Sequence, residues 1–278
     1  MKYFDQKLNE TIDRLKSSLC VGIDPNLNNF PSELIPELKK NREGTVEKFC
    51  KKIIEVTAPY CAAFKPQVAM FSSIACETAL ENLTSWIVKN FPNHILIIDA
   101  KRGDIGTTAQ HYACEIFDRY NAHATTVNPY MGFESLSPFL SRKEKGIYVI
   151  CRTSNPRADE IQNLELKNGE KLFERIAKFA MNECNFNKQV GLVVGATVIE
   201  ELLNIKRICP KLPLLIPGIG KQGGSIAEVV NATKDENNVL INASRSIIFA
   251  SNDDNWIDSA TKEAKKLNDV INKHRSIQ

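Results

Sequence analysis

The segment 99–104, Asp-Ala-Lys-Arg-Gly-Asp, carries the charged residues of this chain that are best placed to do chemistry. It follows the short apolar, β-prone run 94–97, so Asp99 and Lys101 are predicted at the end of a strand. Side chains alternate along a strand, which puts Asp99 and Lys101 on the same face. A carboxylate and an ammonium are costly to desolvate, so the two form either a structural ion pair or a reactive one. Asp104 is predicted as the N-cap or a first-turn acid of the next helix.

Two other predicted strands also end in charged residues. Asp24 and Lys65 each stand at the end of a short apolar run. Either one alone could be a capped turn or a surface charge. Where parallel strands meet at one mouth, however, Asp24, Lys65, Asp99 and Lys101 would lie together around an apolar core. Such alternating charge is a way to hold a protonated lysine ready in a dry pocket.

Two further segments have features of an anion site. Residues 216–224 join a predicted strand to a helix and contain four glycines, which allow close backbone approach and free N–H groups. Arg245 follows the last predicted strand, and its guanidinium can contact a phosphate through two hydrogen bonds. A tight turn and a surface arginine are the alternatives. The two positions together match the places where (β/α)8 barrels often bind phosphate.

The fourth and fifth predicted strands end in turn-rich segments. Asn128 is the last residue of one predicted strand, and Thr153 and Ser154 follow the other. Such residues can be turn formers only, or they can contact the polar edge of a flat ring. The spacing alone leaves both readings open.

Eight short apolar runs alternate with amphipathic segments along the whole chain. The predicted strands are 18–24, 61–65, 95–101, 124–128, 146–152, 190–194, 214–217 and 239–243. The helix-like segments lie around 44–57, 70–90, 104–120, 133–141, 168–184, 197–208, 223–232 and 255–274. The runs are rich in Val, Ile and Leu, as is typical of parallel strands buried on both faces. Eight such units predict a (β/α)8 barrel, and a doubly wound open sheet is the alternative.

The composition excludes several classes of function. The 278 residues are 43% hydrophobic and 25% charged, with no break in composition, which predicts one barrel domain over 1–278. A net charge of +3 predicts no nucleic-acid partner, and no apolar run reaches membrane-spanning length, so a cytoplasmic location is expected. The eight cysteines form no CxxC pair and the four histidines no HxxxH or HExxH pattern, so no metal site is predicted.

From residue 19 to about 249 the chain resembles the orotidine 5'-phosphate decarboxylases, in particular their longer bacterial-type subgroup (type 2). The most specific match is Asp99-Ala100-Lys101-Arg102-Gly103-Asp104-Ile105-Gly106-Thr107-Thr108, which is similar to the family's Asp-x-Lys-x-x-Asp signature. The supporting matches are Gly22-Ile23-Asp24-Pro25, Phe64-Lys65-Pro66-Gln67, Asn128-Pro129-Tyr130-Met131-Gly132, Arg152-Thr153-Ser154-Asn155-Pro156 and Pro217-Gly218-Ile219-Gly220. Ser244-Arg245-Ser246 departs from a Gly-Arg pair of shorter members, and residues 70–79 look unlike the subgroup.

The resemblance implies a decarboxylation of orotidine 5'-phosphate (OMP) to UMP and CO2, without a cofactor, as the last step of de novo pyrimidine synthesis. It implies that Lys101 stabilises negative charge at C6 of the pyrimidine and donates the proton there. Asp99 would hold Lys101 beside the substrate carboxylate. Lys65 would complete the charge network and, with Asp24, contact the ribose.

The resemblance also implies a homodimer with shared active sites. The Asp99–Asp104 loop would reach the neighbouring subunit, where Asp104 and Thr108 contact ribose and Ile105 lines the pocket. The remaining residues expected to bind substrate fall into two groups. Gly220, Gln222 and Arg245 belong to the phosphate end, and Asn128, Thr153 and Ser154 to the base.

Two alternative functions remain open at this stage. Sugar-phosphate decarboxylases and hexulose-phosphate synthases resemble the signature but use a magnesium-bound enediolate, which needs further acidic ligands. A phosphate-binding barrel without catalysis is the other alternative, and the intact Asp99 and Lys101 argue against it. Activity that survives EDTA would separate OMP decarboxylation from the magnesium-dependent alternative. UMP binding without turnover would support the barrel without catalysis.

Overall fold

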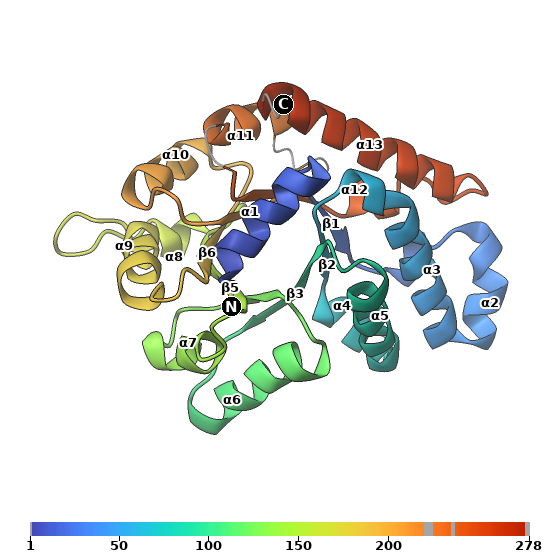
Figure 1. The fold of residues 1–278 in the computed structure, drawn as a ribbon, viewed down its shortest axis with the longest axis horizontal. Coiled ribbons are helices and arrows are strands. Elements are labelled where there is room, and N and C mark those ends of the chain that lie inside the picture. The colour runs from blue at the N-terminus through green and yellow to red at the C-terminus, as the bar shows by residue number, and fades with distance from the viewer. Residues whose placement is uncertain (1, 220–224, 235–236, 276–278) are drawn as a thin grey trace.

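Eight parallel strands close into a barrel in the computed structural model, which describes residues 2–219, 225–234 and 237–275 (Figure 1). The strands follow one another in chain order, and the last strand pairs with the first. They are β1 Leu19–Ile23, β2 Ala63–Pro66, β3 Ile95–Arg102, β4 Ala124–Val127, β5 Gly146–Arg152, β6 Val190–Val194, β7 Leu214–Pro217 and β8 Val239–Ala243. The closed sheet confirms the predicted (β/α)8 barrel and rules out the doubly wound sheet.

Helices surround the barrel on its outside (Figure 1). The α-helices of the described residues are α1 Phe4–Leu15, α2 Ile35–Lys40, α3 Arg42–Thr57, α4 Val68–Ser72, α5 Glu77–Asn90, α6 Gly106–Cys114, α7 Phe133–Leu140, α8 Asp159–Gln162, α9 Leu172–Phe179, α10 Ile199–Ile208, α11 Ile226–Thr233, α12 Arg245–Ile248 and α13 Trp256–Arg275. Three 3₁₀ turns, Leu27–Asn29, Ser32–Leu34 and Ala58–Tyr60, and two π-helical turns, Glu115–Arg119 and Ala180–Cys184, complete the described elements.

The predicted helix 70–90 is wrong in one respect, because the structure divides it into α4 and α5. Ala75 adopts a left-handed conformation with φ 53°, and the Cys76 N–H donates to the Phe71 carbonyl at 3.0 Å. This arrangement closes the end of α4 before α5 begins. The short helices α2 and α8 lie within the segments 25–43 and 153–167, which are outside the predicted strands and helices.

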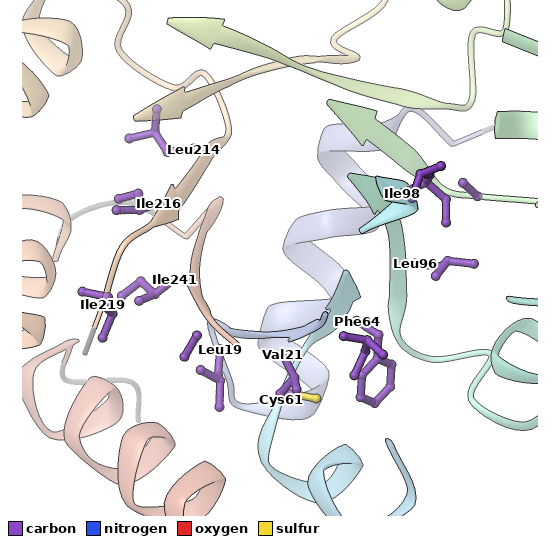
Figure 2. Close-up of a cluster of buried hydrophobic side chains, with 14 of the residues drawn as sticks. Leu19, Val21, Cys61, Phe64, Leu96, Ile98, Leu214, Ile216, Ile219 and Ile241 are labelled. Atoms are coloured by element: carbon purple, nitrogen blue, oxygen red, sulfur yellow. The ribbon is translucent and has the colours of Figure 1, made fainter. Parts of the chain in front are cut away.

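Alternation along the strands separates two apolar layers. Leu19, Val21 and Ile98 face outward into the main core between sheet and helices, as Figure 2 shows for a part of it. Cys20 and Ile97, their neighbours in sequence, face the barrel interior. Both faces of the strands are therefore buried, which explains why their sequences contain so few polar residues.

Helix α1 closes the amino-terminal end of the barrel and was not predicted. Phe4, Leu8 and Ile12 are spaced four residues apart, and all three pack into the inner apolar layer. The Phe4 ring meets the Tyr148 ring edge-on, with centroids 5.8 Å apart. A Cβ at Gly146 would lie 2.4 Å from the Phe4 ring, so only glycine fits beneath it.

The eight cysteines all lie in the described residues, and no disulfide joins them. Seven are buried, as expected for small apolar side chains, and Cys114 is partly exposed. Among the described residues, no helix combines the length and apolar character needed to cross a membrane.

Candidate active site

Three charged side chains from two neighbouring strands meet at the carboxyl ends of β2 and β3. The Lys65 ammonium donates to Asp99 Oδ2 at 2.8 Å, and the Lys101 ammonium donates to Asp99 Oδ1 at 2.6 Å. The side chains of Lys65 and Asp99 are only 5% and 9% exposed, whereas that of Lys101 is 47% exposed. The Lys65–Asp99–Lys101 network therefore consists of a buried ion pair, Lys65 with Asp99, and one ammonium group, that of Lys101, which a bound molecule can reach.

Lys101 reaches Asp99 because the strand is irregular there. The pairing of β3 with β4 shifts register between Ile98 and Arg102, and Lys101 adopts φ 48°. Simple alternation along a regular strand predicted that Asp99 and Lys101 share a face, but it missed this bulge. A left-handed conformation at a lysine costs free energy, and such strain is typical of functional sites.

Thr126 of β4 stabilises this irregular segment, and the sequence interpretation missed it. Its hydroxyl donates to Asp99 Oδ1 at 2.8 Å and accepts the backbone N–H groups of Ala100 and Lys101 at 3.2 and 3.0 Å. The side chain thus orients the carboxylate and the bulged backbone together. The signal available in the sequence was a pair of hydroxyl residues, Thr125 and Thr126, in an otherwise apolar strand.

The charges of the network hold each other in their ionised forms. Burial alone would raise the pKa of Asp99, but Lys65 and Lys101 outweigh it and hold that pKa well below its usual range. Burial would lower the pKa of Lys65, but the charges of Asp99 and Asp24 outweigh it and raise that pKa above its usual value. Both groups are therefore charged at neutral pH.

Lys65 and Asp99 of this network line a cavity of about 150 Å³, whereas Lys101 is not among the described residues that line it. Ten described residues line it: Asp24, Lys65, Asp99, Pro217, Gly218, Ile219, Asn242, Ser244, Arg245 and Ser246. Asp24 Oδ1 and Asn242 Oδ1 are buried and have no hydrogen-bond partner among the described residues. Unpaired buried acceptors are uncommon, and hydroxyl groups of a bound molecule would satisfy them. Asn242 is a candidate binding residue that the sequence interpretation did not select.

Arg245 lies at the rim of this cavity, and its side chain is exposed. The neighbouring Ser244 fits because β1 has a glycine opposite it. A Cβ at Gly22 would lie 1.8 Å from Ser244 Oγ. The predicted phosphate contacts Gly220 and Gln222 lie outside the described residues.

Three predicted site residues of the loop after β3 do not line this cavity. Asp104, Ile105 and Thr108 are not among the described residues that line it, and Ile105 is 58% exposed. The prediction that Asp104 begins the helix is wrong, because α6 starts at Gly106 with Ile105 as N-cap. The Asp104 carboxylate instead accepts the Ile105 N–H at 2.8 Å and shapes the turn before the helix.

Arg102 lies on the opposite side of β3 and is structural. Its guanidinium donates two hydrogen bonds to the Glu115 carboxylate, at 3.1 and 3.0 Å, and lies 4.5 Å from the centre of the Tyr112 ring. These contacts tie the end of β3 to the helix that follows it.

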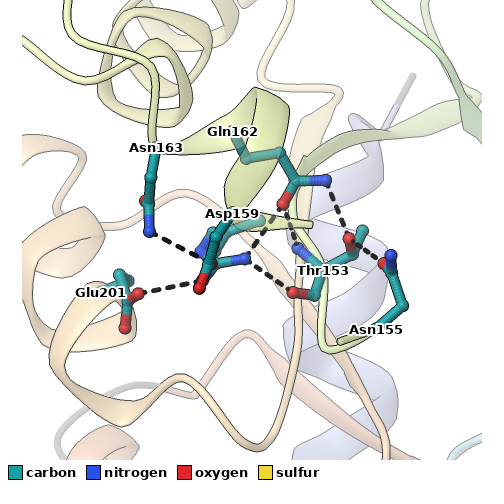
Figure 3. A network of polar contacts seen from close by, with 7 residues as sticks. Thr153, Asn155, Asp159, Gln162, Asn163 and Glu201 are labelled. Atoms are coloured by element: carbon teal, nitrogen blue, oxygen red, sulfur yellow. Dashed lines mark hydrogen bonds and ion pairs between the residues drawn. The ribbon is translucent and has the colours of Figure 1, made fainter. Parts of the chain in front are cut away.

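The residues predicted to contact the pyrimidine base lie on the loops after β4 and β5. Asn128 is exposed, and its Oδ1 accepts the Tyr130 N–H at 3.0 Å, as in a turn. Thr153 belongs to a polar network around α8 (Figure 3). Gln162 accepts the Thr153 N–H at 2.8 Å and donates to its hydroxyl at 2.8 Å, and that hydroxyl donates to Asn155 at 2.6 Å.

Arg152, the last residue of β5, holds the start of the same loop in place. Its buried guanidinium donates to Asp159, to Glu201 at 3.1 Å and to Gln162 at 3.3 Å. Since the hydroxyl and the N–H of Thr153 are both used within this network, Ser154 is the residue of the pair with more freedom to contact a ligand. Ser154 packs against Gly195 of the next loop, where a Cβ would lie 2.7 Å from Ser154 Cβ.

Comparison with protein families gives one match over most of the chain. The sequence profile described as "Orotidine 5'-phosphate decarboxylase / HUMPS family" matches residues 17–258. A protein of Bordetella petrii named orotidine 5'-phosphate decarboxylase is 44% identical over 272 residues, which cover 97% of this chain and 98% of that protein. A protein of Ralstonia pickettii with the same name is 43% identical, covering 98% and 99%.

Solved structures give the same result. The structure of Leishmania donovani OMP decarboxylase matches with a TM-score of 0.83 and 34% identity, over 99% of this chain and all of that chain. The structure of Leishmania donovani UMP synthase matches with a TM-score of 0.85 and 35% identity, over 99% of this chain and 57% of that one.

Proposed function

Since the chain belongs to the orotidine 5'-phosphate decarboxylase / HUMPS family, we infer that it decarboxylates OMP to UMP and CO2 in pyrimidine biosynthesis. The observation that carries the mechanism is the Lys65–Asp99–Lys101 network, in which Lys65 and Asp99 line the cavity and Asp99 holds the Lys101 ammonium. The roles of individual residues below are our proposal, argued from this geometry.

The reaction breaks the bond between C6 of the pyrimidine and its carboxylate, and the electron pair stays on C6. No conjugated acceptor can spread that pair, so a positive charge fixed in advance must stabilise it. Lys101 supplies the charge, because its ammonium is partly exposed and held by Asp99. As CO2 leaves, Lys101 donates a proton to C6, and the resulting amine regains a proton from water.

Asp99 and Lys65 prepare Lys101 for this step. Asp99 binds both ammonium groups, so Lys101 does not need to reorganise when charge develops on C6. With Asp24 included, the site has two positive and two negative charges before the substrate binds. The substrate carboxylate then adds a negative charge beside Asp99, and its departure as CO2 relieves that repulsion.

The remaining cavity residues bind the parts of OMP that do not react. Asp24 and Asn242 present unpaired acceptors that suit ribose hydroxyls. Arg245 binds the phosphate, together with Gly220 and Gln222, and Ser154 and Thr153 contact the pyrimidine edge with Asn128 near by. Binding energy from the phosphate and ribose then holds the base in the reactive position.

We propose that the protein is a homodimer with shared sites. Exposed apolar side chains gather on the segments after β3 and β4, where Ile105, Tyr130, Met131 and Phe133 are 58%, 87%, 51% and 40% exposed. A patch of this kind on a folded chain marks an interaction surface. In the dimer, Asp104 and Thr108 of one subunit contact the ribose in the partner's site, and Ile105 lines it.

Mixing two inactive variants tests the shared site. Lys101→Ala and Asp104→Ala should each lose most activity, but a mixture that exchanges subunits should recover about a quarter of the wild-type sites, since half of the dimers are mixed and each has one intact site. The measurement is OMP turnover before and after mixing. A mixture that exchanges subunits and stays inactive would show that each site is built from one chain.

We further propose that residues 1–278 act as a single barrel domain and that the protein works in the cytoplasm. Eight cysteines without a disulfide are typical of a reducing compartment.

The activity itself is tested by following the loss of OMP absorbance with purified protein, with and without EDTA. We expect turnover at the same rate in both, because the carboxylate of Asp99 already accepts from two ammonium groups and is not free for a metal. Loss of activity in EDTA would instead support a magnesium-dependent reaction of the HUMPS type. UMP binding without turnover would support a barrel that has lost catalysis.

A further inference from the structure

A second cavity lies at the opposite, amino-terminal end of the barrel. It has a volume of about 350 Å³, within the range of small-molecule sites. Its lining includes Lys7 and Arg14 of α1, together with His123 and Lys145, which directly precede β4 and β5. The residues of the Lys65–Asp99–Lys101 network lie near the carboxyl ends of β2 and β3, and the two cavities share no lining residue among those described.

The cations of this cavity are only partly balanced. Lys2, Lys7, Arg14 and Lys145 line it with two carboxylates, Glu10 and Glu144, and Glu10 is paired with Lys2 at 2.6 Å. Within residues 2–219, 225–234 and 237–275, no ion pair within 4 Å is found for Lys7, Arg14 or Lys145. Among the described residues, the side chains of Arg14 and Lys145 donate only to the backbone carbonyls of Asn93 and Ala122, and the Lys145 ammonium also lies 5.9 Å from the centre of the Phe117 ring.

Burial and neighbouring cations disfavour the charged form of Lys7. Burial, together with the charges of Lys145 and Arg14, lowers the pKa of Lys7 below its usual value. Burial also lowers the pKa of Lys145, although the charges of Glu144 and Asp118 act in the opposite direction. An anion between the ammonium groups would remove this cost, because an opposite charge at close range favours the protonated forms.

His123 adds a neutral donor to the same cavity. Its Nδ1 accepts the Leu96 N–H at 2.9 Å, so the proton of the neutral ring is on Nε2. Burial and the charges of Lys7 and Lys145 lower the pKa of His123 to about 3, which keeps the ring neutral at physiological pH. An imidazole N–H beside two ammonium groups and a guanidinium is a donor set suited to phosphate oxygens.

We propose that the cavity lined by Lys7, Arg14, His123 and Lys145 is a second anion site, which binds a phosphate group. The phosphate belongs either to inorganic phosphate or to a small phosphate ester, and the cavity has room for both. This site is distinct from the phosphate end of the proposed active site, and it does not depend on the decarboxylase function.

The test is to follow the four histidine side chains by ¹H–¹⁵N NMR at neutral pH during titration with inorganic phosphate, ribose 5-phosphate or potassium chloride at matched ionic strength. We expect the His123 signals to shift and saturate with either phosphate compound but not with chloride. Tighter binding of ribose 5-phosphate would identify an ester as the preferred ligand, and equal binding would identify the phosphate group alone. The response should persist in Arg245→Ala, in which phosphate binding at the proposed active site is weakened.

Matched variants distinguish phosphate binding in this cavity from a general effect of removing one positive charge. Lys7→Gln and Lys145→Gln should each weaken the phosphate response of His123 by about tenfold or more, which corresponds to at least one charge-assisted hydrogen bond. The control Lys39→Gln removes an exposed lysine of α2 and should leave the response unchanged. The proposal is wrong if His123 does not respond, if it responds equally to chloride, or if its phosphate response in Lys7→Gln and Lys145→Gln is as strong as in the wild type.

Discussion

Replacing Lys101 by alanine should reduce kcat by about four orders of magnitude or more while the protein stays folded. The variant loses both the charge that stabilises the C6 carbanion and its proton donor. Fixed charge stabilisation contributes about 10²–10³-fold and proton transfer about 10²–10⁴-fold in other enzymes. The side chain is 47% exposed, so its removal leaves no large hole in the core.

The measurement is single-turnover decay of OMP absorbance with enzyme in excess, together with thermal unfolding. Lys39→Ala provides the matched control, because it removes an exposed lysine of α2 that does not line the cavity. We expect normal kcat in the control and unfolding temperatures close to wild type in both. A Lys101→Ala enzyme that works at near-normal rate would show that another group protonates C6.

Replacing Arg245 by alanine should weaken UMP binding by about 10–100-fold and leave uridine binding nearly unchanged. Charge-assisted hydrogen bonds contribute about 1.5–3 kcal/mol, and uridine lacks the phosphate that would make them. Arg245 is exposed at the rim of the cavity, so the substitution is not expected to disturb packing.

Calorimetric titration of both ligands into wild type and Arg245→Ala gives the required comparison. The difference between the two ligands matters more than either affinity, since it isolates the phosphate. Equal weakening of UMP and uridine would place Arg245 near the nucleoside or in a structural role, and the phosphate assignment would have to be abandoned.

The sequence predicted the architecture because each strand is buried on both faces. The run 190–194, for example, is apolar at every position, and β6 has those bounds in the structure. In a soluble chain, a short run that is apolar at every position is typical of a parallel strand buried on both faces. The charged strand ends then predicted that Lys65, Asp99 and Lys101 lie together, and the closed barrel brings them together.

What the sequence did not predict depends on contacts between distant segments. The bulge at Lys101 requires Thr126, which lies on the next strand and hydrogen-bonds to Asp99 and to the bulged backbone. The N-cap prediction for Asp104 was wrong because the turn after β3 extends one residue further, so that Ile105 is the N-cap of α6. Helix α1 closes the amino-terminal end of the barrel because it packs against Tyr148 and Gly146, and no local sequence pattern reveals these contacts.

The central claim is that Lys101, held by Asp99, transfers a proton to and from C6. By microscopic reversibility, an enzyme that protonates the C6 carbanion also removes the C6 proton of bound UMP. In D₂O, the C6 proton of UMP should therefore exchange for deuterium in the presence of the enzyme, which ¹H NMR detects as loss of the C6–H signal.

This exchange, measured with wild type and with Lys101→Ala at saturating UMP, is the most direct test. We predict exchange with wild type and none above the uncatalysed rate with Lys101→Ala, although the variant still binds UMP. Equal exchange rates in the two enzymes would contradict the account.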